Sequence, residues 1–185
     1  MKTLLLSAVV ALAATAASTP AAAGLISIGN STARDCYEAA IARSADRNSF
    51  SHCDIALDQE GLTPQDRAAT LVNRGALYLR GHNYRSAGRD FDAALKSDSN
   101  NAEAWLNLAI VNLQQGGSTD ALPMIEKSLA LNTDRQALAY YSRAIANERM
   151  GQIRAAYADL RRAHDLAPAW REPSEDLKRY QVRPR

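Results

Sequence analysis

The sequence predicts an all-α protein in which antiparallel helix hairpins stack on one another. The first observation is an internal repeat, because the pattern that starts at Ala68 returns 34 residues later and again 35 residues after that. The second is spacing, since Leu71, Gly75 and Tyr78 fall on one face of a helix. The third is a break at 81–83, after which the same spacing resumes. Each copy is thus a helix hairpin whose apolar faces are covered only when copies stack.

Three copies occupy residues 63–168, at about 68–101, 102–136 and 137–170. Equivalent positions carry small or apolar side chains: Gly75, Ala109 and Ala144; Ala87, Ala121 and Ala156; Phe91, Ile125 and Leu160. The small residues allow two helices to approach closely, and Phe91 fills the space beside them. We expect the charged side chains of this second helix mostly on the solvent side: Arg85, Arg89, Asp90 and Asp92. Thr63 is a good N-cap for the first helix, and Pro64 suits its first position.

These positions resemble the signature of the tetratricopeptide-repeat family, W-x2-L-G-x2-Y followed by A, F and P. The second copy carries Trp105-x2-Leu108-Ala109, the first carries Gly75-x2-Tyr78, and the third ends in Pro168. The resemblance covers residues 68–168. It implies a right-handed superhelical stack of hairpins, an α-solenoid.

Residues 24–62 are predicted to form a divergent hairpin ahead of the first copy, with its turn at 46–48. Cys36 and Cys53 are equidistant from a point close to that turn, so on antiparallel helices they lie level with each other. We predict a disulfide between them, which would add about 3 kcal/mol of stability; two unlinked buried thiols are the alternative. Aligned with the later copies, Cys36 falls on Arg74 and Cys53 on Phe91.

Both ends of the chain carry a recognisable pattern. Residues 1–23 have Lys2, an apolar run and a small-residue site at 21–23, as in a cleavable signal peptide; an uncleaved anchor is the alternative. We therefore expect export to the periplasm or the medium of a Gram-negative bacterium, with no stable membrane span after cleavage. Residues 171–185 are predicted to form a capping helix over 174–182 and a tail.

Charge and motifs argue against several classes of function. The net charge is +2, but residues 135–185 contain 11 basic and 6 acidic side chains. This excess indicates either a solvated arginine-rich helix face or an anionic partner. The sequence has no GxSxG, HExxH, Walker A or dinucleotide-binding glycine pattern, and His52, His82 and His164 are scattered. We expect no enzymatic activity, no cofactor, no metal and no nucleic-acid partner.

The family resemblance implies a protein- or peptide-binding module in which the first helix of each copy lines a concave groove. Carried over by position, the groove residues are Val72, Ala76, Leu79 and Arg80; Leu106, Ile110, Leu113 and Gln114; Tyr141, Ile145, Glu148 and Arg149. Family members that grip a C-terminal carboxylate pair a groove Lys with an Asn. Here the Lys positions hold Val72 and Leu106, which disfavours that mode and leaves Arg80 and Arg149 as polar anchors.

Three alternatives to ligand binding stay open for this stripe of groove residues. First helices in a stack contact neighbours on both sides, and a terminal helix could fold back over the stripe. The face could also serve a second copy of the chain, so that the protein would be a self-assembling homo-oligomer of the envelope rather than a scaffold for a foreign partner.

Overall fold

The computed structural model describes residues 31–42 and 45–180. Their regular structure is helical: α1 (Thr32–Ala42), α2 (Arg47–Gln59), α3 (Pro64–Arg80), α4 (Tyr84–Ser97), α5 (Ala102–Gln114), α6 (Ser118–Ala130), α7 (Gln136–Arg149), α8 (Ile153–Leu166) and α9 (Arg171–Leu177). The predicted signal peptide at 1–23 and the end of the tail at 181–185 lie outside the described residues.

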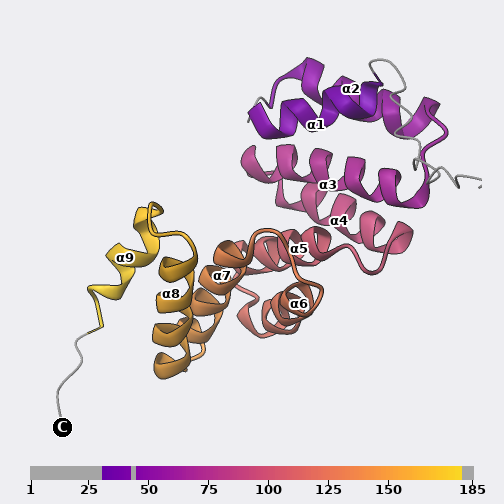
Figure 1. Cartoon of the computed structure of the whole chain (residues 1–185). Helices are drawn as coiled ribbons and strands as arrows, with labels where there is room; N and C mark the ends of the chain where they lie inside the picture. Colours follow the sequence, from indigo (N-terminus) through magenta and orange to yellow (C-terminus); the bar gives the residue numbers. More distant parts are fainter. Residues whose placement is uncertain (1–30, 43–44, 181–185) are drawn as a thin grey trace, which may run out of the picture.

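Consecutive helices pair into hairpins, α1 with α2, α3 with α4, α5 with α6, and α7 with α8 (Figure 1). Each hairpin packs on the next one, and α9 follows against α8. The stack runs in chain order from the indigo end to the yellow end of Figure 1. The predicted all-α solenoid of stacked hairpins is therefore confirmed.

Helix starts follow the sequence signals closely. The Thr63 hydroxyl accepts a hydrogen bond from the Asp66 amide at 3.1 Å, and Pro64 is the first residue of α3. The other two boundary predictions need correction. Helix α2 begins at Arg47, inside the expected turn at 46–48. Helix α9 spans 171–177 rather than starting at 174, because Pro173 is tolerated in the first turn of a helix.

The core is a series of small clusters between hairpins. The largest joins Leu106 and Leu113 of α5 to Ile125 of α6 and to Ala139 and Ala146 of α7. All five side chains are at most 4% exposed. Such clusters exist only when neighbouring hairpins are stacked, as expected for a repeat protein.

One polar pair departs from the solvent-exposed position that we expected for Asp90. The Arg74 guanidinium donates to both carboxylate oxygens of Asp90, at 2.9 and 2.7 Å, and Asp90 is buried. Its hydrogen bond to Asp90 raises the pKa of Arg74. Arg143 and Asp159 repeat the same arrangement between α7 and α8, at 2.9 and 2.6 Å. Asp90 is buried because a guanidinium sixteen residues earlier in the chain satisfies both of its oxygens.

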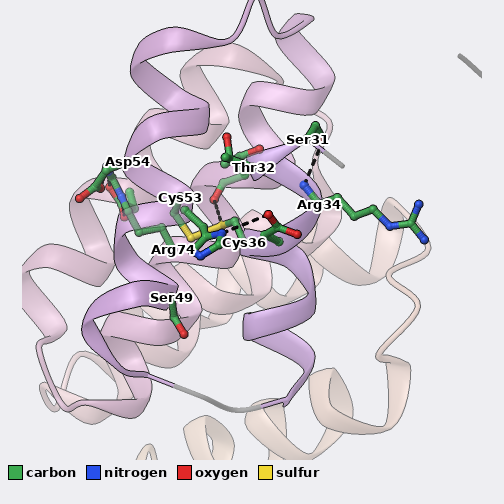
Figure 2. The surroundings of a disulfide bond; sticks show 12 residues. Ser31, Thr32, Arg34, Cys36, Ser49, Cys53, Asp54 and Arg74 are labelled. Carbon is green, nitrogen blue, oxygen red and sulfur yellow. Dashed lines mark hydrogen bonds and ion pairs between the residues drawn. A yellow bond between two sulfur atoms is a disulfide. The ribbon is translucent and has the colours of Figure 1, made fainter. Parts of the chain in front are cut away.

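The predicted disulfide between Cys36 and Cys53 is confirmed, with an S–S distance of 2.09 Å and both residues fully buried. Figure 2 shows it joining α1 to α2. Asp35 and His52, each one residue before a cysteine, approach each other at 3.2 Å. The disulfide therefore staples the divergent hairpin at its centre.

These contacts correct the alignment of α1 by one residue. The pair Asp35–His52 occupies the place of Arg74–Asp90, so Cys36 corresponds to Gly75 and not to Arg74. The core agrees, since Cys36 and Ala40 pack with Leu77 as Ala109 and Leu113 pack with Ala146. The cause is the connection, because α1 and α2 are separated by residues 43–46, one residue more than the 81–83 turn.

Candidate functional site on the first helices

The candidate site is one face of the four first helices, α1, α3, α5 and α7. With the corrected alignment, three positions repeat across these helices at i, i+3 and i+7, on one side of each helix. We call this surface the first-helix face. Its polar row is Arg34, Asn73, Asn107 and Ser142; its middle row is Tyr37, Ala76, Ile110 and Ile145; its outer row is Ile41, Arg80, Gln114 and Arg149.

The middle row is apolar throughout. Ala76, Ile110 and Ile145 are half-buried, and the two isoleucines pack on the core cluster beneath them. Tyr37 differs, because 52% of its surface is exposed. The middle row is thus an apolar strip of half-buried side chains that ends in an exposed aromatic ring on α1.

The outer row contains two guanidinium groups held in equivalent ways. Arg80 donates to the Ala40 carbonyl at 2.6 Å, and Arg149 donates to the Leu113 carbonyl at 2.5 Å. Ala40 and Leu113 are equivalent residues near the C-terminal ends of α1 and α5, where carbonyl groups lack helical partners. Both arginines are nevertheless exposed, and Gln114 lies exposed between them. Each of the two predicted polar anchors is therefore held by a hydrogen bond to a carbonyl of the preceding first helix.

The polar row is largely occupied by bonds within the protein. Asn107 is 3% exposed and accepts a hydrogen bond from Arg135 at 2.6 Å. Arg135 also donates to Glu103 at 2.7 Å, and Thr133 donates to the same carboxylate. Ser142 is buried as well. Asn107 therefore holds α5 and α7 together and has little capacity left for a ligand.

Two predicted groove residues are wrong, because Leu106 and Leu113 are core residues. Both face the next hairpin, where they pack on Ala139 and Ala146 of α7. Val72 and Leu79, at the equivalent positions of α3, are half-buried in the clusters between α3 and its neighbours. This stripe stacks hairpins, which is one of the alternatives that the sequence left open.

Tyr141 and Glu148, at the same positions of α7, are engaged by the C-terminal segment. The Tyr141 hydroxyl donates to Asp176 at 2.9 Å, and its ring lies 4.8 Å from that of Trp170. Burial, with the hydrogen bond to Asp176, raises the pKa of Tyr141 to about 12. Arg179 donates to Glu148 at 3.1 Å. The segment that contains α9 therefore covers these two side chains, as a next hairpin would.

Sequence reasoning missed Tyr37 and Ile41. Alignment by sequence placed Glu38, not Tyr37, at the middle row, because it ignored the extra residue in the connection after α1. The spacing of the two cysteines held the missing signal. It is 17 residues, whereas Gly75 and Phe91, which occupy the equivalent places, are 16 apart.

The chemistry available on this face is that of binding. It presents aliphatic, aromatic, amide and guanidinium groups, which suit contact with a peptide chain. Within residues 31–42 and 45–180, His, Cys, Asp and Glu form no group of three that could hold a metal ion. No helix in the same ranges is long and apolar enough to cross a membrane.

We compared the sequence with protein families and with known proteins. No family model matches the chain. It is 32% identical over 90 residues to human protein O-mannosyl-transferase TMTC3, covering 48% of this chain and 10% of that protein. It is 33% identical over 86 residues to mouse superkiller complex protein 3, covering 40% of this chain and 6% of that protein. The chain thus spans a tenth or less of the curated relatives that it matches.

Among solved structures, the chain is similar to MamA (residues 41 to the end) from Desulfovibrio magneticus RS-1. The TM-score is 0.63 at 21% identity, over 80% of this chain and 82% of that one. A second MamA structure matches with a TM-score of 0.61 at 19% identity, over 77% and 80% of the two chains. At these identities the likeness concerns the fold. The repeat signature, the stacked hairpins and these similarities together show that the chain has a tetratricopeptide-repeat fold.

Proposed function

We propose that this protein is a non-catalytic scaffold that binds a segment of a partner protein on its first-helix face. The observation that carries the proposal is the middle row, where Ala76, Ile110 and Ile145 hold apolar groups at the surface of three successive first helices. Stacking accounts for only part of this row: Ile110 and Ile145 pack on the core cluster that contains Leu106 and Leu113, yet both stay half-buried at the surface. A repeated apolar strip beside exposed arginines is a surface suited to an extended protein segment.

We further propose that it works in the bacterial cell envelope. Two features support this: the signal-like residues 1–23 and the buried disulfide, a bond typical of oxidising compartments. Fractionation of cells that produce the full chain tests the location. Recovery of full-length, reduced protein in the cytoplasm would contradict it.

The binding proposal is tested by capture from an envelope extract, followed by titration of the purified partner. The test variant is Ala76→Glu/Gln114→Glu, which places two carboxylates on the first-helix face without removing a core side chain. The matched control is Thr119→Glu/Ala158→Glu, at exposed sites on the second helices α6 and α8. We expect the first variant to lose the partner and the control to keep it, with equal melting temperatures.

Equal capture by both variants would show that the first-helix face is not the binding surface. Sedimentation of the same proteins tests the alternative of self-assembly. A concentration-dependent oligomer that only the first variant abolishes would mean that the partner is a second copy of the chain.

A further inference from the structure

The two most exposed large apolar side chains of the N-terminal hairpin lie together on the first-helix face. Tyr37 is 52% exposed and Ile41 is 61% exposed. They are one turn apart on α1, so their side chains are neighbours on its surface. The buried residues Cys36 and Ala40 precede them in sequence and lie about 100° away around the helix axis, facing the core. An adjacent exposed pair of this kind needs an explanation that a single exposed side chain does not.

Missing stacking contacts do not explain the pair. In each later hairpin, two residues of the first helix are buried against the preceding hairpin. The first position is Thr70, Ala104 or Ala139, and the second is Leu77, Val111 or Ala146. In the first hairpin these positions hold Ser31, just before α1, and Glu38, and both residues are polar. The end of the stack is therefore polar, as terminal repeats require. Tyr37 and Ile41 belong instead to the middle and outer rows.

The charged side chains within the three rows have one sign. The three rows of the first-helix face contain Arg34, Arg80 and Arg149 and no carboxylate. Glu38 lies beside the face and pairs with Arg34 at 3.2 Å, while Glu103 is paired with Arg135. The first hairpin as a whole is acidic, with six acidic and two basic side chains, Arg34 included, in residues 31–42 and 45–60. Every charged side chain within the three rows is therefore basic, although other basic side chains lie elsewhere, including Arg154, Arg161 and Arg162 on α8.

The pair is also held in a fixed position. Cys36, next to Tyr37, is bonded to Cys53 of α2. Ala40, next to Ile41, accepts the hydrogen bond from Arg80 of α3. The backbone that carries the pair is therefore fixed before a ligand binds, so that only side-chain freedom remains to be lost.

We infer that Tyr37 and Ile41 form the anchoring subsite for an apolar side chain of an extended, acidic peptide segment, whose carboxylates lie along the arginines of the outer row. The inference rests on the proposed function, because it names the ligand of the same face. The expected ligand is a peptide, because an extended chain can follow the apolar middle row across successive helices and place carboxylates beside the outer row.

The test is binding of fluorescein-labelled synthetic peptides long enough to cross all four first helices, measured by anisotropy. Three probes are compared: an Asp- and Glu-rich peptide with one central Phe or Leu, the same peptide with Ala at that centre, and a version with Lys in place of each acid. The variant is Tyr37→Ala/Ile41→Ala, and the matched control is Ile153→Ala, a 51% exposed apolar residue of α8. We expect only the first probe to bind well, the variant to weaken it at least tenfold and the control to change it less than twofold.

Four outcomes would overturn the inference: no binding of any probe, equal binding of the Lys version, an unchanged affinity of the Tyr37→Ala/Ile41→Ala variant, or a dimer that this variant abolishes while peptides do not bind. The last would make the subsite a contact between copies. These failures are separate from failure of the proposed function. If the Tyr37→Ala/Ile41→Ala variant still captures the envelope partner and Ala76→Glu/Gln114→Glu does not, the face binds a partner but its anchor is elsewhere.

Discussion

A Cβ atom placed on Gly75 would lie 2.5 Å from Cε1 of Phe91, and its next two contacts, to the same ring, would be at 2.9 Å. Phe91 is fully buried, so its ring has no free space into which it could move. The closest contact in the α3–α4 hairpin therefore depends on a residue without a side chain. The disulfide occupies the equivalent place in the first hairpin.

We predict that Gly75→Ala destabilises the protein by about 1–3 kcal/mol, because overpacking forces helices or rings apart. The matched control is Gly88→Ala, also inside a helix, where a Cβ would meet the nearest atom, Cγ1 of Val111, at 3.7 Å. That change should leave stability unchanged or raise it by up to about 1 kcal/mol, because Ala is the better helix former. Urea unfolding measures both, and equal effects would contradict the packing argument.

Removal of the Asp90 carboxylate alone should lower the free energy of unfolding, whereas replacement of both Arg74 and Asp90 should leave it nearly unchanged. In Asp90→Ala, the half-buried Arg74 would keep only its exposed partner Asp54, and we expect a loss of about 2–4 kcal/mol. The double variant Arg74→Leu/Asp90→Met copies the apolar pair found at the equivalent positions 108 and 124. Chemical denaturation should show it within about 1 kcal/mol of the wild type. A double variant as unstable as the single one would mean that the ion pair itself stabilises the hairpin.

Ser128 offers a stabilising substitution. Its hydroxyl is fully buried and has no hydrogen-bond partner among the described residues, and the equivalent positions hold Ala94 and Ala163. Ser128→Ala should raise the unfolding free energy by about 1 kcal/mol, since an unsatisfied buried hydroxyl is removed. Ser97→Ala is the control, because the Ser97 hydroxyl is bonded to the Ala93 carbonyl. A lower melting temperature for Ser128→Ala would contradict this account.

Loss of the disulfide should loosen the first hairpin selectively. The double variant Cys36→Ala/Cys53→Ala is expected to lower the free energy of unfolding by about 3 kcal/mol in the chain-entropy model. Hydrogen exchange should show faster opening of α1 and α2, with α5 to α8 little changed, because distant hairpins share few contacts. A reducing agent should reproduce the effect in the wild type and add nothing in the variant. Uniform destabilisation of all hairpins would show a more cooperative stack.

The contact between Tyr141 and the C-terminal segment should weaken at alkaline pH. The pKa of Tyr141 is raised from 10 to about 12 in the folded protein, so folding favours the protonated phenol. Its contribution is therefore complete below about pH 10 and is lost as the pH rises through about 12. Burial also raises the pKa of Tyr180, so ultraviolet titration of the tyrosines should show late phenols, and the signal near pH 12 should be missing in Tyr141→Phe. A wild-type curve without that signal would contradict the prediction.

Much of the fold could be predicted because helix periodicity and repeat length act locally along the chain. The part that failed depends on pairs of residues distant in sequence. Leu106 and Ile110 are both aliphatic and lie on one helix, and only the neighbouring hairpin decides which of them is buried. Asp90 looked solvent-exposed because its partner Arg74 lies on another helix. The position of Tyr37 could not be predicted because the connection after α1 has one extra residue. This residue shifts the alignment of α1 with the later first helices by one position.

The polar end at Ser31 and Glu38 and the α9 segment over Tyr141 have a geometric consequence for any ligand. Between them lie four first helices, whose axes at about 8–10 Å spacing give the middle row a length of about 30 Å. An extended peptide advances about 3.3 Å per residue, so about nine residues would cross the whole row. The face would then select its ligands by length as well as by charge, because each shorter segment would leave at least one helix without a contact.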